Sequence, residues 1–185
     1  MKSTKLVSRY AQALYDFSVE TDKIETVYHD VLFAQKIISS HQELKAVLES
    51  PCVTQEKKQK ILSAVFNNNL SEITLRFFSL LAKKRRLPQL LLICAQYMKI
   101  YYKNHNIKEV YITTAFPIPE ETQQYLQSFL CRNSPYTYIF HLSVNPAIIG
   151  GIVVKIDDLC FDAGIRAKIN KLKIEFSKNN YAAGF

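Results

Sequence analysis

The sequence predicts a mainly α-helical protein with an N-terminal six-helix bundle over residues 1–105 and a small α+β domain over residues 106–185. Two observations predict this class. Apolar residues recur at helical spacing through the first 105 residues, between short polar or proline-containing breaks. After residue 105, runs of β-branched and aromatic residues alternate with helical segments, as in small mixed domains. The chain has 185 residues, 48% of them apolar, which is enough for two domains that each bury a core.

Each helix of the first part has a recognisable start or stop. Pro51 ends the third helix, because proline disfavours helical geometry at the residue before it. Thr54 and Ser71 suit the N-caps of the fourth and fifth helices, and Pro88 fits the first turn of the sixth. The helices are expected at about residues 4–20, 23–39, 42–48, from 54 to the break at 67–71, from 71 to the break at 85–89, and 88–102.

The second part reads as strand, helix, strand, hairpin and helix. "KEVYITTAF" and "YTYIFHLSV" are rich in β-branched and aromatic residues, so both are expected to be strands. "GIVVKI" and "LCFD" flank a two-residue turn and indicate a hairpin. The elements are expected at residues 108–116 (strand), 119–131 (helix), 136–144 (strand), 151–162 (hairpin) and from about 163 onward (helix).

The first and fifth helices have more apolar surface than one core contact needs. On a helical wheel, one stripe of each helix is expected to face the core, and a second apolar stripe lies on another side. Either both helices are buried on two sides, or a groove between them receives an amphipathic helix from a partner. The expected core stripes are Leu6, Tyr10, Ala13 and Phe17, and Ile73, Phe77, Leu80 and Leu81; the second stripes are Val7, Ala11 and Tyr15, and Leu75, Phe78 and Ala82.

The basic charge is concentrated in the middle of the chain. The net charge is +8, and residues 57–106 contain 10 Lys or Arg and a single acid, including "KKRR" at residues 83–86. Such a segment should face an acidic surface, either of a protein assembly or of a nucleic acid. No aromatic-rich recognition strand or known nucleic-acid motif accompanies it, so a protein interface or a solvated helix end is the favoured interpretation.

The stretch "NPAIIGGIVVKIDDLCFDAGI" resembles an active site but is expected to be structural. Gly150 and Gly151 precede a strand, and phosphate-binding glycine loops need a following helix N-terminus. Asp157 and Asp158 fall at a turn, where aspartate is common for conformational reasons. Asp162 suits the N-cap of the last helix. An enzyme centred on residues 150–162 is therefore the least favoured hypothesis.

The sequence contains no catalytic motif, so no catalytic residue, metal site or cofactor is expected. The four histidines are scattered without a cysteine or carboxylate at ligand spacing. The four cysteines are too widely spaced for a zinc site or a disulfide framework. They are expected to be reduced and buried, and Cys94 and Cys160 in particular lie among apolar neighbours.

Four segments, in order along nearly the whole chain, carry a family resemblance: "SRYAQALYDFSVE", "LLAKKRRLPQLLLICAQY", "VYITTAFPIPEE" and "NPAIIGGIVVKIDDLCFDAGIRAKINKLK". Together they resemble the delta subunit of F-type ATP synthases, whose mitochondrial counterpart is the oligomycin-sensitivity-conferring protein. In two positions the chain departs from the family pattern: Asn145 stands where aspartate is usual, and Gly164 where serine is usual. Both replacements suit a turn or a cap.

The resemblance implies a non-catalytic stator subunit that joins the catalytic head to the peripheral stalk, so that proton-driven rotation is coupled to ATP synthesis. Its helical domain would hold the N-terminal helix of an alpha subunit between the first and fifth helices. Its smaller domain would bind the C-terminal region of the b subunit. The expected alpha-subunit contacts, taken from the second stripes, are Val7, Ala11, Tyr15, Leu75, Phe78 and Ala82.

The resemblance also implies a location at the cytoplasmic face of the bacterial inner membrane, with contact to the membrane only through the complex. A start directly at the first helix favours a bacterial chain over a processed organellar one. The basic middle segment would meet an acidic surface of the head, and no nucleic acid is expected as a partner. A basic nucleic-acid-binding protein that uses residues 57–106 remains the alternative.

Overall fold

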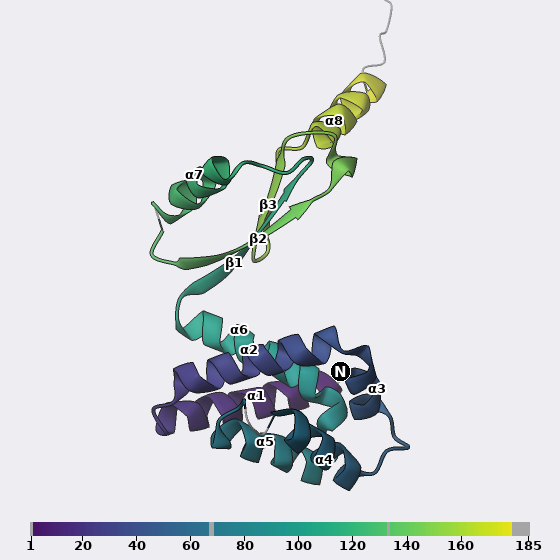
Figure 1. The fold of residues 1–185 in the computed structure, drawn as a ribbon. Coiled ribbons are helices and arrows are strands. Elements are labelled where there is room, and N and C mark those ends of the chain that lie inside the picture. Colours follow the sequence, from purple (N-terminus) through teal and green to yellow (C-terminus); the bar gives the residue numbers. More distant parts are fainter. Residues whose placement is uncertain (1, 67–68, 133, 179–185) are drawn as a thin grey trace, which may run out of the picture. The chain divides into compact units, whose positions relative to one another are not determined.

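A computed structural model describes residues 2–66, 69–132 and 134–178 of the chain (Figure 1). The chain divides into two compact units, Met1–Asn104 and His105–Phe185. The described residues are mainly helical, and the second unit contains a four-stranded sheet. The predicted combination of a mainly helical protein with a small α and β part is therefore confirmed.

The first unit is built around its last helix, α6, whose side chains Ile93, Tyr97 and Met98 are among the buried ones. α1 and α2 pack against α6, and α4 packs against α5. Pro88 lies in a short 3-10 helix, η1, and not in the first turn of α6. The elements are α1 (Lys2–Glu20), α2 (Ile24–Ser40), α3 (Gln42–Glu49), α4 (Gln55–Phe66), α5 (Glu72–Lys83), η1 (Leu87–Gln89) and α6 (Leu90–Asn104).

The second unit is a mixed sheet with two helices. The strand order is β2-β1-β3-β4, in which β1 and β2 are parallel and the other pairs are antiparallel. α7 connects the two parallel strands, as a crossover of this kind requires. The elements are β1 (Ile107–Thr114), α7 (Glu120–Cys131), β2 (Thr137–Val144), η2 (Pro146–Ile148), β3 (Ile152–Ile156), β4 (Leu159–Asp162) and α8 (Ile165–Lys178).

The core of the second unit is small. Apart from Gly164, its buried residues among those described come from β1 and the residue after it: Val110, Ile112, Thr114 and Ala115. The strand register places Ile112 beside Leu142 of β2 and Val154 of β3, so the apolar face of the sheet is centred on β1. None of the helices in the described part of the chain is both long and apolar enough to cross a membrane.

Candidate partner-binding site

α1 buries the stripe that the sequence pattern placed on its outer side. Val7 and Ala11 are 6% and 0% exposed, and Leu14 and Ser18 continue the same buried face toward α6. The stripe expected to face the core is the accessible one: Phe17 is 46% exposed, Ala13 is exposed, and Leu6 and Tyr10 are half-buried. The prediction of which stripe of α1 faces the core is therefore wrong, although α1 does have two apolar stripes.

α5 shows the same reversal. Phe78 and Ala82 are 2% and 1% exposed, and Thr74 and Leu81 complete the buried face. Of the stripe expected to face the core, only Leu81 does so. Leu80 is 44% exposed, and Ile73 and Phe77 are half-buried. The outer surface of α5 is therefore apolar at these three positions.

The six residues expected to contact a partner divide into two groups. Val7, Ala11 and Ala82 lie inside the helical unit, so a partner can reach them only if the helices separate, and Phe78 is 2% exposed at the base of a groove described below. Tyr15 and Leu75 are half-buried and remain accessible. The Tyr15 ring lies 6.2 Å from the buried ring of Tyr97, centroid to centroid. Each helix therefore has one accessible apolar stripe, and the two together are called the outer stripe below: Leu6, Tyr10, Ala13 and Phe17 on α1, and Ile73, Phe77 and Leu80 on α5.

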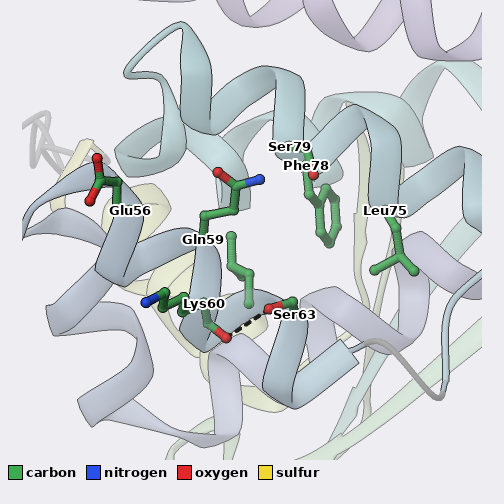
Figure 2. Close-up of a pocket in the computed structure, with 8 residues that line it drawn as sticks. Glu56, Gln59, Lys60, Ser63, Leu75, Phe78 and Ser79 are labelled. Carbon is green, nitrogen blue, oxygen red and sulfur yellow. Dashed lines mark hydrogen bonds between the residues drawn. The ribbon is translucent and has the colours of Figure 1, made fainter.

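α5 has two partly exposed flanks on opposite sides of its buried face. At about 100° per residue, Ile73 and Phe77 fall on one flank, and Leu75 and Ser79 fall on the other. The Leu75 flank forms a groove of about 440 Å³ with α4 (Figure 2). Leu62, Leu75 and Phe78 supply the apolar part of this groove, and the remaining lining residues are polar: Glu56, Gln59, Lys60, Ser63 and Ser79.

The start of α5 is fixed by a buried carboxylate from α2. Asp30, which is 8% exposed, accepts hydrogen bonds from the backbone N–H of Ser71 at 2.9 Å and from the Thr74 hydroxyl at 2.7 Å. The Ser71 hydroxyl donates to the same oxygen, Oδ2. Ser71 was expected to cap α5 with its own side chain, and it makes no such bond. Sequence reasoning found the position of the cap but not its partner, because Asp30 lies 41 residues earlier.

A buried lysine fixes the start of α4 against the end of α3. Lys58 is 1% exposed, and its Nζ donates to the backbone oxygen of Leu48 at 2.6 Å. Leu48 lies in the last turn of α3, where free carbonyl groups and the helix dipole favour a positive charge. Burial lowers the pKa of Lys58. Together, Asp30 and Lys58 hold in place the two helices that border the groove.

The glycine- and aspartate-rich stretch forms turns and not a reactive centre. Gly151 has φ +84°, and a Cβ there would collide with the backbone oxygen of Ala163, so this position requires glycine. Asp157 and Asp158 form the turn between β3 and β4, with Asp157 at φ 50°. A Cβ added at Gly150 would approach only the flexible end of the Ile165 side chain.

Asp162 has a different role from the one expected. It is the last residue of β4, and its carboxylate accepts a hydrogen bond from the Gly164 N–H at 2.8 Å. α8 starts only at Ile165, so Asp162 shapes the turn before the helix and is not its N-cap. Cys160 is exposed on β4, contrary to expectation, as are Cys52 and Cys131; Cys94 is buried. No three metal-binding side chains are grouped together within the described ranges.

α8 presents an apolar stripe that the other described residues of the unit leave uncovered. Its members are spaced at helical intervals, and none is buried: Ile165 is 44%, Ile169 40%, Leu172 50% and Phe176 74% exposed. On the edge strand β4, Leu159 and Phe161 are 73% and 78% exposed. So much exposed apolar surface is typical of a protein interaction site.

Comparison with known proteins gives a consistent family match. The family model of the ATP synthase delta (OSCP) subunit matches residues 6–176. The chain is 30% identical to the ATP synthase subunit delta of Cytophaga hutchinsonii, over 96% of this chain and 97% of that one. It is 31% identical to the ATP synthase subunit delta of Salinibacter ruber, over 93% and 90% of the two chains.

A solved structure has the same fold. A chain in the mitochondrial ATP synthase hexamer of Toxoplasma gondii superposes with a TM-score of 0.76, covering 93% of this chain and 97% of that one. The two sequences are 17% identical. At that identity the likeness describes the arrangement of helices and strands and says nothing of individual contacts.

Proposed function

The chain belongs to the ATP synthase delta (OSCP) subunit family and is a non-catalytic stator subunit, and on this premise we propose how its two units bind their partners. The helical unit holds the N-terminal helix of an alpha subunit. The second unit binds the C-terminal region of the b subunit. The subunit thereby joins the catalytic head to the peripheral stalk, at the cytoplasmic face of a bacterial inner membrane.

The outer stripe is the observation that carries this proposal. Phe17 and Leu80 are 46% and 44% exposed, and half-buried aromatic side chains flank both of them. An amphipathic helix recognises such a surface through apolar side chains at positions i, i+3, i+4 and i+7. The expected contacts therefore move from the buried Val7 and Phe78 to the outer stripe, and Tyr15 and Leu75, which lie on the other flank of α1 and of α5, are not part of it.

The uncovered stripe of α8 supports the second attachment. A helix from the stalk that packed on Ile169 and Leu172 would remove from water a surface that is exposed among the described residues. At roughly 25 cal/mol per Å² of apolar surface, such burial favours association. The small core of the second unit would gain stability from the same contact.

A stator needs strong attachment and no chemistry. The rotor exerts torque on the catalytic head, and the head turns with it unless a fixed part holds it. Two attachments, one on each unit, transmit the opposing force from the stalk to the head. This requirement agrees with a chain in which the glycines and aspartates of residues 150–162 form turns.

Binding of the full chain to a synthetic peptide with the sequence of the partner alpha subunit's N-terminus tests the proposal. Leu80→Asp should weaken binding at least about tenfold, as expected for an exposed anchor residue. Leu92→Asp is the matched control, because Leu92 is 56% exposed on α6 and outside the outer stripe. Phe78→Asp would be uninformative, since it places a carboxylate in the core. Equal affinity of the Leu80 and Leu92 variants would refute the contact assignment.

The second attachment has a parallel test with a soluble C-terminal segment of the b subunit. Leu172→Asp should reduce its affinity, and Ser177→Asp, an exposed control on the same helix, should leave it nearly unchanged. If both variants bound the segment like the unaltered chain, α8 would not be the attachment surface.

A further inference from the structure

The groove between α4 and α5 points to an interaction that the two proposed attachments do not use. We propose that this groove is a second docking surface of the helical unit, and that it receives an acidic segment of the catalytic head anchored by one apolar side chain. The identity of the occupant as part of the head rests on the proposed function, whereas the existence of the groove does not depend on it.

The groove is separate from the outer stripe. Leu75 and Ser79 line it from one flank of α5, whereas Ile73 and Phe77 lie on the opposite flank. The crest between the two flanks bears Arg76, which forms an exposed ion pair with Glu72 at 2.5 Å. A helix bound to the outer stripe would therefore leave the groove open.

The shape of the groove suits the insertion of a side chain. Its volume of about 440 Å³ is within the range of ligand-binding pockets, roughly 300–1,000 Å³. Leu62 and Phe78, which are 4% and 2% exposed, form an apolar floor that is held in place by the core. Half-buried Leu75 adds an accessible apolar wall (Figure 2). Polar groups on both helices surround this floor and can bind the backbone of an inserted segment.

The charge around the groove selects an acidic occupant. Lys60 lies exposed on α4 and lines the groove, and Lys83 and Lys84 follow at the end of α5. Lys83 and Lys84 line an adjoining hollow of about 450 Å³ that shares Leu75 and Ser79 with the groove, so the basic surface is continuous with it. Leu80 of the outer stripe also lines this hollow but does not line the groove. The acids nearby are Glu56 and the paired Glu72. Complementary charge of this kind steers association and discriminates between partners.

A protein segment fits this surface better than a nucleic acid. Single strands are bound by stacking of bases on exposed aromatic rings along a basic channel. The aromatic residue that lines the groove, Phe78, is buried and cannot offer a free face. An apolar floor beneath a basic rim is instead the complement of an apolar side chain flanked by carboxylates.

The test measures binding of the full chain to a catalytic head that has been depleted of this subunit. Lys60→Glu reverses the charge of the lysine that lines the groove from α4 and is called the rim variant. Lys99→Glu makes the same change in net charge at an exposed position of α6 and is the control. The rim variant should bind the head about tenfold more weakly and with a smaller dependence on salt. The control should change affinity by no more than about twofold.

Two further measurements separate the possible outcomes. Leu75→Ala should weaken binding to the head about threefold or more while leaving the salt dependence unchanged, because it removes apolar contact alone. The rim variant should bind the alpha-subunit peptide with unaltered affinity, so a failure of the outer stripe and a failure of the groove can be told apart. Melting temperatures of all variants identify any that are misfolded.

Three results would overturn the proposal. An equal loss of affinity for the head in the rim and control variants would mean that the lysines act only through the overall electrostatic field of the protein. An unchanged affinity of both the rim variant and Leu75→Ala for the head would mean that the groove is not occupied. Binding of a single-stranded oligonucleotide in competition with the head, lost in the rim variant, would assign the surface to nucleic acid.

Discussion

The carboxylate of Asp30 is the residue whose removal should most strongly affect the position of α5. It is 8% exposed, and one oxygen accepts three hydrogen bonds from the first turn of that helix and its cap. Asp30→Ala leaves the Ser71 N–H and the two hydroxyl donors without this acceptor. It also removes a negative charge from a helix N-terminus, where the helix dipole favours one.

The size of the effect follows from these contacts. A hydrogen bond to a charged group contributes about 1.5–3 kcal/mol, and an N-cap about 1 kcal/mol. The three bonds share one oxygen, and the hydroxyl of Ser71 can rotate to cap α5 itself, so the terms are not additive. We expect Asp30→Ala to lower the free energy of unfolding by about 2–4 kcal/mol. Asp30→Asn keeps an acceptor and loses the charge, so about 1 kcal/mol is expected.

Urea unfolding of the full chain, followed by far-UV circular dichroism, measures this change. Because the chain has two units, the transitions are fitted separately. With a slope of about 2 kcal/mol per M, the Asp30→Ala midpoint of the helical unit should fall by roughly 1–2 M. Asp16→Ala, which removes an exposed hydrogen bond from Gln12, should change stability by less than about 0.5 kcal/mol. An effect of Asp30→Ala as small as that of the control would refute the reasoning.

Three further outcomes are expected. Gly151→Ala should destabilise the second unit by about 1–3 kcal/mol in urea, because of its φ of +84° and a clash with backbone, whereas Gly150→Ala should cost less than about 1 kcal/mol. Burial raises the pKa of the Cys94 thiol to about 12, so a thiol reagent should modify the three exposed cysteines of the native chain and reach Cys94 only in denaturant. As pH rises toward 10.5, the free energy of unfolding of the unaltered chain should increase relative to that of Lys58→Met. Because its pKa is lowered, Lys58 releases its proton at a lower pH in the folded chain than in the unfolded chain, so rising pH favours the folded state while Nζ still donates to Leu48.

The order and type of the elements could be predicted because local chemistry determines their ends. Pro51, Thr54 and Ser71 mark breaks that the structure shows between α3, α4 and α5. Leu159 and its neighbours pair as the predicted hairpin, with a left-handed residue, Asp157, in the turn. These signals involve residues a few positions apart. The Asp30 cap and the Lys58 contact join different helices, and no local pattern indicates them.

Hydrophobicity alone could not predict which stripe of α1 and of α5 faces the core. On each helix the more apolar stripe, with Phe17 on α1 and Leu80 on α5, was expected inside. The buried faces instead combine large apolar residues, such as Phe78 and Leu81 on α5, with small or polar ones: Ala11, Ser18 and Thr74 are all 0% exposed. Small side chains let helices approach closely, and protein cores are closely packed.

The polar members of the buried stripes are tolerated because their hydroxyl groups have partners. Ser18 Oγ donates to the Tyr15 backbone oxygen at 2.6 Å, and Thr74 Oγ donates to Asp30. A hydroxyl with an internal partner avoids the cost of burial, so these residues do not count against the core face. Because these polar residues can share the core face with Leu14 on α1 and with Phe78 and Leu81 on α5, the other apolar stripe of each helix is left at the surface. The reversal of the expected faces and the accessible apolar surface of the outer stripe therefore have the same physical cause.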